Sequence, residues 1–477
     1  MIIPNVPFFA SPLLAQESVA ANVQIEYILQ QVLTPTGAVL TLLGVMLAIV
    51  ALLFRRLMLV MALLALLCVM FQLHPDALTV NILLPPLQSF RFISKSLAFV
   101  LMCVAIVGVF QVPRLDERSP VGFAACGLIA FQLLYTVQLL LFTEEGLAKG
   151  MLGLVSMSSM FVVFGIGFGR MMRSADSTQR CIEIFVWVSV AFVAINLIQV
   201  VADIKGAFVG GRLTGICGNA QTLAAFAAIM LLINCYVYQT SLATRLLKWV
   251  SLVLIGALAA MVLASGSRTG ALSAVVGILF MYRMRVARLA IVCILLLISY
   301  YAVSYFATDT GAAVDRLIST ENTREAVWSS AFEDFFRSPI FGQFPFLRTG
   351  DRLNEVESSF LRALANMGIL GGVVLAVPFA KGISDAVRVY RHQAASPGLQ
   401  HLIDLYIGSM AMLIVQNTFD GYVFGYLSLP AIYLYLHFTL GHFLASAVSQ
   451  PEDVWQLDES SNTEIDTQQV NIAGSHH

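Results

Sequence analysis

Apolar runs of about 20 residues recur along nearly the whole chain, and this recurrence restricts the possible folds more than any other feature. A helix of about 20 apolar residues crosses a hydrocarbon core about 30 Å thick. Strands of a membrane β-barrel would instead alternate apolar and polar residues. Charged residues make up 12% of the chain, against about 25% in globular proteins. The sequence therefore predicts an all-α, polytopic transmembrane helix bundle.

The apolar runs predict about 12–14 spans, and most of the polar connections between them are short. The expected spans are residues 37–54, 57–73, 96–112, 120–142, 150–171, 181–201, 219–239, 246–264, 268–282, 286–306, 358–380, 399–418 and 421–446. Residues 76–90 contain Pro85-Pro86 and are only moderately hydrophobic, so we expect an interfacial or re-entrant piece there.

The same pattern divides the chain into five segments. These are an N-terminal periplasmic or interfacial segment (1–36), the N-terminal part of the bundle (37–306), one large loop (307–357), the C-terminal part of the bundle (358–446) and a tail (447–477). The tail is polar and poor in aliphatic residues, which is typical of a disordered segment. Its last residues, Gly474-Ser-His-His, resemble a remnant of a purification tag.

The basic residues of the short connections predict the orientation of the bundle. They fall on alternate loops, hence on one face, at Arg55-Arg56, Arg114, Arg118, Arg173, Arg180, Arg245, Lys248, Arg283, Arg285, Arg288, Lys381, Arg388 and Arg391. The positive-inside rule makes this face cytoplasmic. The N-terminus, the loop 307–357 and the segments that contain Arg212 and Arg268 are then expected outside, and the C-terminal tail inside.

The sequence contains no motif for several common classes of site. The seven cysteines are scattered and show no CxxC or Cys/His ligand spacing, so neither disulfides nor structural zinc are expected. No Walker loop, dinucleotide fingerprint or metal-ligand cluster is present. The net charge of −1 gives no reason to expect nucleic acid as a partner. A site without metal or cofactor is therefore predicted.

The loop 307–357 is the one long polar interruption of the apolar chain, and it contains five arginines among nine acidic residues. Within it, Thr323 to Phe336 reads as an amphipathic helix with Arg324 at its start. Ser338-Pro-Ile-Phe-Gly then ends that helix. Arg324 is a candidate substrate-binding residue. The alternative is a helix that lies on the membrane surface without a role in a site.

Arg212 lies in Gly210-Gly-Arg-Leu-Thr-Gly-Ile-Cys-Gly-Asn-Ala, directly before a predicted span. The glycines let the backbone turn and come close to a ligand. The following helix would point unpaired N–H groups toward the same place, which favours an anion. Arg212 and Asn219 are therefore candidate substrate-binding residues. The alternative for Arg212 is a cation in the lipid headgroup zone.

Arg268 lies in Ala264-Ser-Gly-Ser-Arg-Thr-Gly-Ala-Leu-Ser, between two spans with almost no loop. An arginine near membrane depth costs about 2.5–3.5 kcal/mol on insertion scales, so it needs an anionic partner, water or a functional reason. We therefore treat Arg268 as a candidate catalytic and substrate-binding residue. The alternative is an arginine that snorkels at a tight turn.

Two carboxylates lie at the predicted outer face beside spans. Glu357 precedes Ser358-Ser-Phe-Leu and is a candidate general base. Its alternative role is to complement the dipole of the following helix. Asp420 follows Asn417-Thr-Phe and is a candidate substrate-binding residue, with a simple turn as the alternative.

In order and topology these segments resemble the O-antigen ligase and polymerase (Wzy-type) superfamily of bacterial envelope glycan assembly. The resemblance covers roughly residues 205–380 and rests on short, degenerate motifs. They are Arg212-Leu-Thr-Gly…Gly-Asn, Ser267-Arg-Thr-Gly-Ala-Leu, Arg324…Trp328…Phe336-Arg-Ser-Pro-Ile-Phe-Gly, Glu357-Ser-Ser-Phe-Leu and Asn366-Met-Gly-Ile-Leu-Gly-Gly. The N-terminal third is similar only in being hydrophobic.

The resemblance implies a multi-pass glycosyltransferase of the bacterial inner membrane with a periplasmic active site. Such enzymes use glycans carried on undecaprenyl pyrophosphate, need neither nucleotide sugars nor metals, and invert the anomeric centre. Arg212 and Arg268 would match the family's outer-face arginines, which are proposed to hold the pyrophosphate. Arg324 would match the arginine of the large loop. Expected partners are the lipid-linked oligosaccharide, membrane lipids, a flippase and a chain-length regulator.

One departure bears on the kind of transfer. Ligases have a His where this chain has Glu357, which favours a polymerase of exopolysaccharide or O-antigen repeats. The alternative in the same superfamily is a ligase that transfers the glycan to lipid A core or protein. A transporter or flippase is a third reading. It is disfavoured because the candidate groups gather at one face and not at the midplane of the bilayer.

Overall fold

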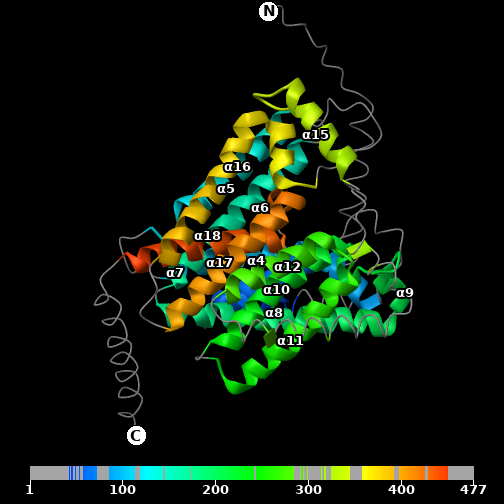
Figure 1. Ribbon diagram of the computed structural model, residues 1–477, viewed down its shortest axis with the longest axis vertical. Helices are drawn as coiled ribbons and strands as arrows, with labels where there is room; N and C mark the ends of the chain where they lie inside the picture. Colours follow the sequence, from blue (N-terminus) through cyan, green and yellow to red (C-terminus); the bar gives the residue numbers. More distant parts are fainter. Residues whose placement is uncertain are drawn as a thin grey trace, which may run out of the picture.

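The computed structural model describes residues 57–71, 85–112, 119–142, 146–172, 174–240, 243–283, 324–343, 357–391, 397–424 and 428–449, with scattered positions in 42–53, 290–298 and 313–317. This part of the chain is almost entirely helical (Figure 1). The α-helices are α3 (Leu57–Phe71), α4 (Pro85–Gln111), α5 (Phe123–Phe142), α6 (Gly146–Met160), α7 (Phe168–Met171), α8 (Ala175–Ala202), α9 (Ile204–Ala207), α10 (Ala220–Gln239), α11 (Arg245–Ala264), α12 (Arg268–Tyr282), α15 (Glu325–Arg337), α16 (Ser359–Arg391), α17 (Pro397–Phe419) and α18 (Leu429–Val448).

Short elements complete the described part. The π-helix η2 (Phe161–Gly167) joins α6 to α7, and two 3-10 turns, η3 (Gly215–Cys217) and η5 (Tyr422–Phe424), precede α10 and α18. A two-stranded antiparallel hairpin, β1 (Phe208–Val209) and β2 (Arg212–Leu213), is the one sheet among these residues.

The length and composition of the helices confirm the prediction of an all-α polytopic membrane protein. Eight helices of the described part are long and apolar enough to cross a membrane, and three shorter apolar helices lie at 57–67, 100–111 and 268–282. Each of the eleven overlaps a predicted span. The predicted spans 37–54 and 286–306, the segment 1–36, most of the loop 307–357 and the tail beyond 449 lie outside the fully described ranges.

Several predicted boundaries are wrong. Helix α16 continues to Arg391, beyond the expected end at residue 380, and α8 begins at Ala175, before the expected start at residue 181. The last span was expected to begin at residue 421, but Tyr422–Phe424 forms a 3-10 turn and α18 begins at Leu429, where Ser428 caps it and Pro430 lies in its first turn. Proline is tolerated there because the first N–H groups of a helix have no partner within it. Residues 85–90 were expected in an interfacial piece and instead begin the long helix α4.

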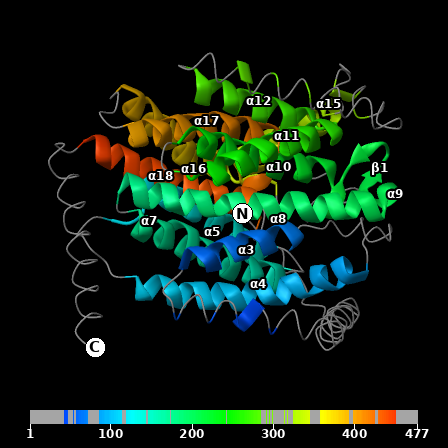
Figure 2. The same ribbon diagram turned by 90° about the horizontal axis from the view of Figure 1, so that it is seen from below.

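Helix α10 lies at the centre of the bundle. In Figure 2 the helices α3 and α4 lie on one side and α11 and α12 on the other, with α8, α10 and α18 between them. Burial agrees with this placement: 89% of the apolar window of α10 is inside the protein, against 39% for α11. Helices buried on all sides are apolar all round, as the sequence of α10 is.

Close contacts of small residues set the register of α12 against its neighbours. A Cβ atom on Gly408 of α17 would lie 2.7 Å from the carbonyl oxygen of Gly277 in α12, and one on Gly270 would lie 2.4 Å from Ala224 Cβ in α10. Small residues allow membrane helices to approach this closely. The start of α12, the start of α10 and the end of α17 therefore meet at one end of the bundle.

Helix α16 is interrupted at Gly368, and the segment that follows α15 is bound to the break. Gly368 has φ 64°, and its neighbour Ile369 donates its N–H to the carbonyl of Pro339 at 2.8 Å. Gln343 likewise donates its N–H to the carbonyl of Ala365 at 2.8 Å. These bonds satisfy backbone groups that a broken helix would leave unpaired. They fix α15 over the start of α16.

Candidate functional site

A cavity of about 620 Å³ lies at the end of the bundle where α10, α12, α16 and α17 meet. Segments far apart in the sequence contribute its walls. The lining residues are Arg212, Gln221, Gly266, Ser267, Arg268, Thr269, Leu272, Arg316, Arg324, Val327, Trp328, Glu357 and Phe419. Four of them are arginines and one is a carboxylate. We call this the arginine cavity.

The β-hairpin brings Arg212 to the cavity. Gly210 and Gly211 form its two-residue turn, and both have the positive φ (57° and 70°) that such tight hairpins favour. The Nε–H of Arg212 donates to the carbonyl of Ser265 at 2.8 Å, which ties the hairpin to the turn between α11 and α12. Burial, and next the charge of Arg316, lower the pKa of Arg212 to about 10, and Glu357 opposes them. Arg212 therefore remains charged at neutral pH.

Each residue of Ser267-Arg-Thr-Gly has a distinct structural role. Ser267 caps α12, since its hydroxyl accepts from the N–H of Gly270 at 3.2 Å. Arg268 is half-buried in the wall of the cavity, and Thr269 accepts a hydrogen bond from Arg324. The positive end of the α12 dipole thus faces the cavity, where it adds to the arginine charges.

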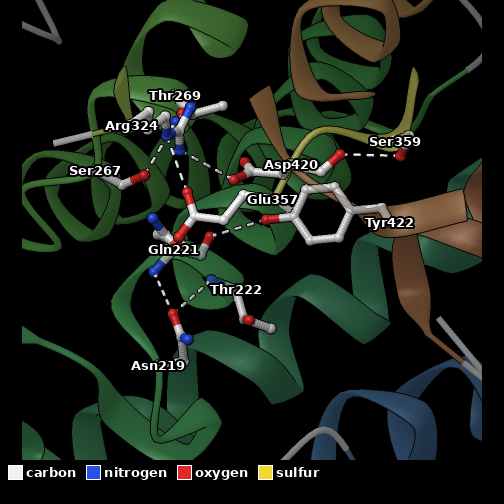
Figure 3. A network of polar contacts seen from close by, with 11 residues as sticks. Asn219, Gln221, Thr222, Ser267, Thr269, Arg324, Glu357, Ser359, Asp420 and Tyr422 are labelled. Atoms are coloured by element: carbon white, nitrogen blue, oxygen red, sulfur yellow. Dashed lines mark hydrogen bonds and ion pairs between the residues drawn. The ribbon is translucent and has the colours of Figure 1, made fainter. Parts of the chain in front are cut away.

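Arg324 joins the large loop to the bundle through two carboxylates (Figure 3). Its Nε lies 2.9 Å from an oxygen of Glu357, and one of its terminal nitrogens lies 3.4 Å from Asp420 Oδ1. The same nitrogen donates to Thr269 Oγ1 at 3.1 Å. The guanidinium carbon also lies 5.6 Å from the ring centre of Phe419, within range of a cation–π contact.

The Glu357-Ser-Ser segment is held in place by its two serines. Ser358 Oγ accepts from the N–H of Leu361 in the first turn of α16. Ser359 Oγ bonds to Asn417 Oδ1 at 2.9 Å and to the carbonyl of Asp420 at 3.0 Å. The start of α16 is therefore fixed to the end of α17, and Glu357 is positioned beside Arg324.

Asp420 is a buried carboxylate directly behind this pair. Burial raises its pKa to about 7, while Arg324 lowers it, Glu357 raises it and a hydrogen bond with Tyr422 lowers it to smaller extents. The hydroxyl of Tyr422 also donates to the carbonyl of Gln221 at 3.3 Å (Figure 3). Burial, followed by the charge of Asp420, raises the pKa of Tyr422, so this phenol stays protonated.

An aromatic wall from α15 and α17 completes the cavity. The rings of Trp328 and Phe419 stack with their centres 6.0 Å apart. The Nε1–H of Trp328 is buried and has no hydrogen-bond partner among the described residues. A donor in this state is expected to bind an acceptor supplied by a ligand or by water.

The charges of the arginine cavity favour an anion with several negative charges. Arg212, Arg268, Arg316 and Arg324 face it, with Glu357 as the one carboxylate of its lining. Guanidinium groups bind phosphate oxygens in pairs and stay charged at neutral pH. Glu357 lines the same cavity beside Arg324, and its carboxylate is the group there that could accept a proton from a bound hydroxyl.

The structure brings most of the predicted site residues together. Arg212, Arg268, Arg324 and Glu357 line one cavity, and Asp420 joins them through its ion pair with Arg324. Asn219 has a different role: its carboxamide oxygen caps α10 by accepting from the N–H groups of Gln221 and Thr222 at 2.8 and 3.3 Å. It is absent from the lining of the arginine cavity.

Sequence reasoning missed other residues of the site. Arg316, Gln221, Arg362 and Tyr422 were not among the candidates, although all four lie beside Glu357 in a cavity wall. Arg362 could have been predicted from the sequence, because it lies within a predicted span. A charged side chain inside a membrane is energetically costly and usually has a function. The other three follow no recognisable pattern.

Within the described residues, no group of three or more His, Cys, Asp or Glu side chains is arranged to hold a metal ion. No protein-family model matches the sequence, and no curated protein is significantly similar to it.

Proposed function

We propose that this protein is a membrane-embedded glycosyltransferase that polymerises lipid-linked oligosaccharide repeats. The observation that carries the proposal is that four arginines and one carboxylate, from distant parts of the chain, line a single cavity at the end of an apolar helix bundle. The substrate class that fits best is a glycan on undecaprenyl pyrophosphate, because it combines a polyanion with a hydrocarbon tail that needs a membrane.

Pyrophosphate is already a good leaving group, so the protein has to stabilise the charge that develops on it. Arg212, Arg268 and Arg316 are suited to bind its oxygens. A donor directed at developing charge contributes roughly 3–4 kcal/mol to the stabilisation of a transition state. Arg324 has a second task in this proposal, since its two ion pairs hold Glu357 and Asp420 in position.

In the proposed step the acceptor hydroxyl oxygen bonds to the anomeric carbon of the donor glycan. The bond from that carbon to the pyrophosphate oxygen breaks, and the pyrophosphate leaves with the electron pair. Glu357 takes the hydroxyl proton and passes it to water. Attack from the face opposite the leaving group inverts the anomeric centre.

The location of the reaction belongs to the same proposal. The cations of the short connections favour an active face on the periplasmic side of a bacterial inner membrane, with the N-terminus outside and the C-terminus inside. The polyprenyl tails would lie against the apolar helices. A flippase would deliver the lipid-linked repeats, and a chain-length regulator would set the number of transfers.

The test replaces the two residues closest to the proposed chemistry. Cells that carry Arg268→Ala or Glu357→Gln, at wild-type levels of membrane-inserted protein, are expected to lose long polymer and accumulate single lipid-linked repeats. Loss of a base lowers the rate about 10²–10⁴-fold. Arg337→Ala is the matched control, because Arg337 is an exposed arginine of α15 paired with Glu333 and outside the cavity lining. Wild-type polymer lengths in both test variants would remove these residues from the mechanism.

Purified protein separates the polymerase from a ligase. Elongation of lipid-linked repeats with no other acceptor present is expected of a polymerase. A requirement for lipid A core or a protein acceptor would favour a ligase instead.

A further inference from the structure

We infer that a second, smaller cavity beside the first binds the acceptor sugar and contacts it at its hydroxyl groups, away from the lipid end. This inference rests on the proposed function. It adds where the acceptor binds, which the proposed function does not specify. The cavity has a volume of about 180 Å³. Its lining residues are Gln221, Thr222, Glu357, Arg362, Asp420, Gly421 and Tyr422. We call it the acceptor cavity.

The two cavities share Glu357 and Gln221. The Glu357 carboxylate therefore borders both, and a group in either cavity lies beside it. A base for group transfer has to contact the attacking hydroxyl while the leaving group lies on the other side of the reacting carbon. A shared carboxylate between two cavities satisfies that geometry.

The two cavities differ in charge, so they are expected to bind different parts of the substrates. Beyond the shared Glu357, the arginine cavity has Arg212, Arg268, Arg316 and Arg324. Apart from Glu357, the charged residues of the acceptor cavity are one cation, Arg362, and a second carboxyl group, Asp420. Two carboxyl groups close together oppose the binding of a pyrophosphate. The lipid end of the acceptor is therefore expected to lie outside this cavity.

The polar groups of the acceptor cavity match the hydroxyl groups of a sugar. A hydroxyl both donates and accepts, so it needs partners of both kinds. Arg362 donates, Asp420 accepts when ionised, and the hydroxyls of Thr222 and Tyr422 do either. Polar partners of this kind suit a sugar better than a lipid tail.

Arg362 is held firmly enough to discriminate between sugars. Its guanidinium carbon lies 4.8 Å from the ring centre of Phe424, and a terminal nitrogen donates to the hydroxyl of Tyr135 at 3.4 Å. The Tyr135 and Phe424 rings in turn pack edge to face, 4.7 Å apart. A donor fixed in this way loses little further freedom when a ligand binds. Arg362 is therefore a specificity-determining residue.

The test measures the affinity for an acceptor that has no lipid. The probe is the free oligosaccharide repeat, released by mild acid from the lipid-linked intermediates of the cells that make this protein. Thr222→Val and Arg362→Gln are expected to raise the KM for this probe about tenfold each, the effect of one hydrogen bond worth about 1.4 kcal/mol. The KM for the lipid-linked donor and kcat at saturating acceptor are expected to stay within about twofold. Arg362→Lys retains the charge if Arg362→Gln fails to fold.

A second readout does not depend on turnover. Saturation-transfer NMR on the detergent-solubilised full chain reports binding of the probe directly, and Tyr433→Phe is the control because that buried tyrosine bonds to Ser409, outside both cavity linings. Weaker binding in the two test variants, with normal binding in the control, supports the inference. Equal binding in all of them overturns it, as does a rise in donor KM with acceptor KM unchanged.

The two proposals fail in different ways. If wild-type protein transfers no sugar from lipid-linked donor, the proposed function fails, and the NMR comparison still decides whether this cavity binds the oligosaccharide. If transfer occurs while Thr222→Val and Arg362→Gln leave acceptor KM and probe binding unchanged, only the acceptor cavity is wrong.

Discussion

At the scale of single residues, Arg324 determines how the other charges of the site are arranged. It lies between Glu357 at 2.9 Å and Asp420 at 3.4 Å, and Thr269 accepts from it as well. From the sequence, Arg324 was a candidate substrate-binding residue. Its contacts within the protein favour a positioning role, because a guanidinium that binds two carboxylates has less charge to offer an anion.

Asp420 allows a test of this arrangement by pH. Its pKa of about 7 lies above the ordinary value near 4, so the folded protein binds this proton more tightly than the unfolded chain does. The stability contributed by Asp420 is therefore present at low pH and is lost as pH rises from about 4 to about 7, with a slope of at most about 1.4 kcal/mol per pH unit.

The measurement compares wild type with Asp420→Asn, which cannot titrate, by thermal unfolding in detergent between pH 4 and 8. The stability of the wild type relative to the variant is expected to fall with rising pH and to level off above about pH 7. A difference that stays constant across this range would contradict the shifted pKa.

At the scale of elements, the break in α16 connects the large loop to the bundle. Gly342 and Gly368 both have positive φ (74° and 64°), and their backbones are in direct contact. The motifs Ser338-Pro-Ile-Phe-Gly and Asn366-Met-Gly thus form one structural unit, although they were recognised separately in the sequence. Since α15 contributes Val327 and Trp328 to the arginine cavity, this unit sets the position of its aromatic wall.

Replacing Gly368 by alanine tests the connection. A Cβ at this position would lie 2.4 Å from the Ile340 carbonyl, and positive φ itself costs about 1–3 kcal/mol for a residue other than glycine. Gly368→Ala is expected to lower the unfolding temperature and to reduce polymer formation, because α15 is displaced. The control is Gly256→Ala in α11, where a Cβ meets nothing within 4 Å and alanine favours the helix. Equal behaviour of the two variants would contradict a structural role for the contact.

At the scale of the whole molecule, charge is separated between the two ends of the bundle. The arginine cavity lies where α12 begins and α17 ends, whereas Arg283 at the end of α12 pairs with Asp404 in α17 at 3.2 Å. Because α12 and α17 run antiparallel and pack closely, these charged groups lie at opposite ends of both helices. In the described part of the bundle, the arginine cavity therefore lies at the end opposite the Arg283–Asp404 pair.

Ligand binding to that cavity is expected to stabilise the whole fold. A ligand at 100 times its Kd stabilises the native state by about 2.7 kcal/mol. Undecaprenyl pyrophosphate should therefore raise the unfolding temperature of wild type, while uncharged undecaprenol should not. The Arg212→Gln/Arg268→Gln double variant should lose the effect. Equal stabilisation of wild type and double variant would exclude the arginine cavity as the binding site.

The sequence alone was sufficient to locate the apolar helices of the described part, although several of their ends were misplaced. Apolar runs of membrane-crossing length have few alternatives to helices, and capping serines such as Ser267 and Ser358 are local signals. Arg268 and Glu357 could be recognised for the same reason, because a charge beside an apolar run is conspicuous.

Only the tertiary structure decided which charges meet. The pairing of Arg324 with Glu357 and Asp420, the contact between Gly342 and Gly368, and the placement of Arg362 and Tyr422 beside Glu357 all join segments distant in the chain. Such contacts depend on how helices pack, and packing is set by the shapes of many side chains together. The pattern of apolar residues in the sequence predicts that a residue lies near the end of a helix. Which residues of other helices it contacts depends on how the helices pack.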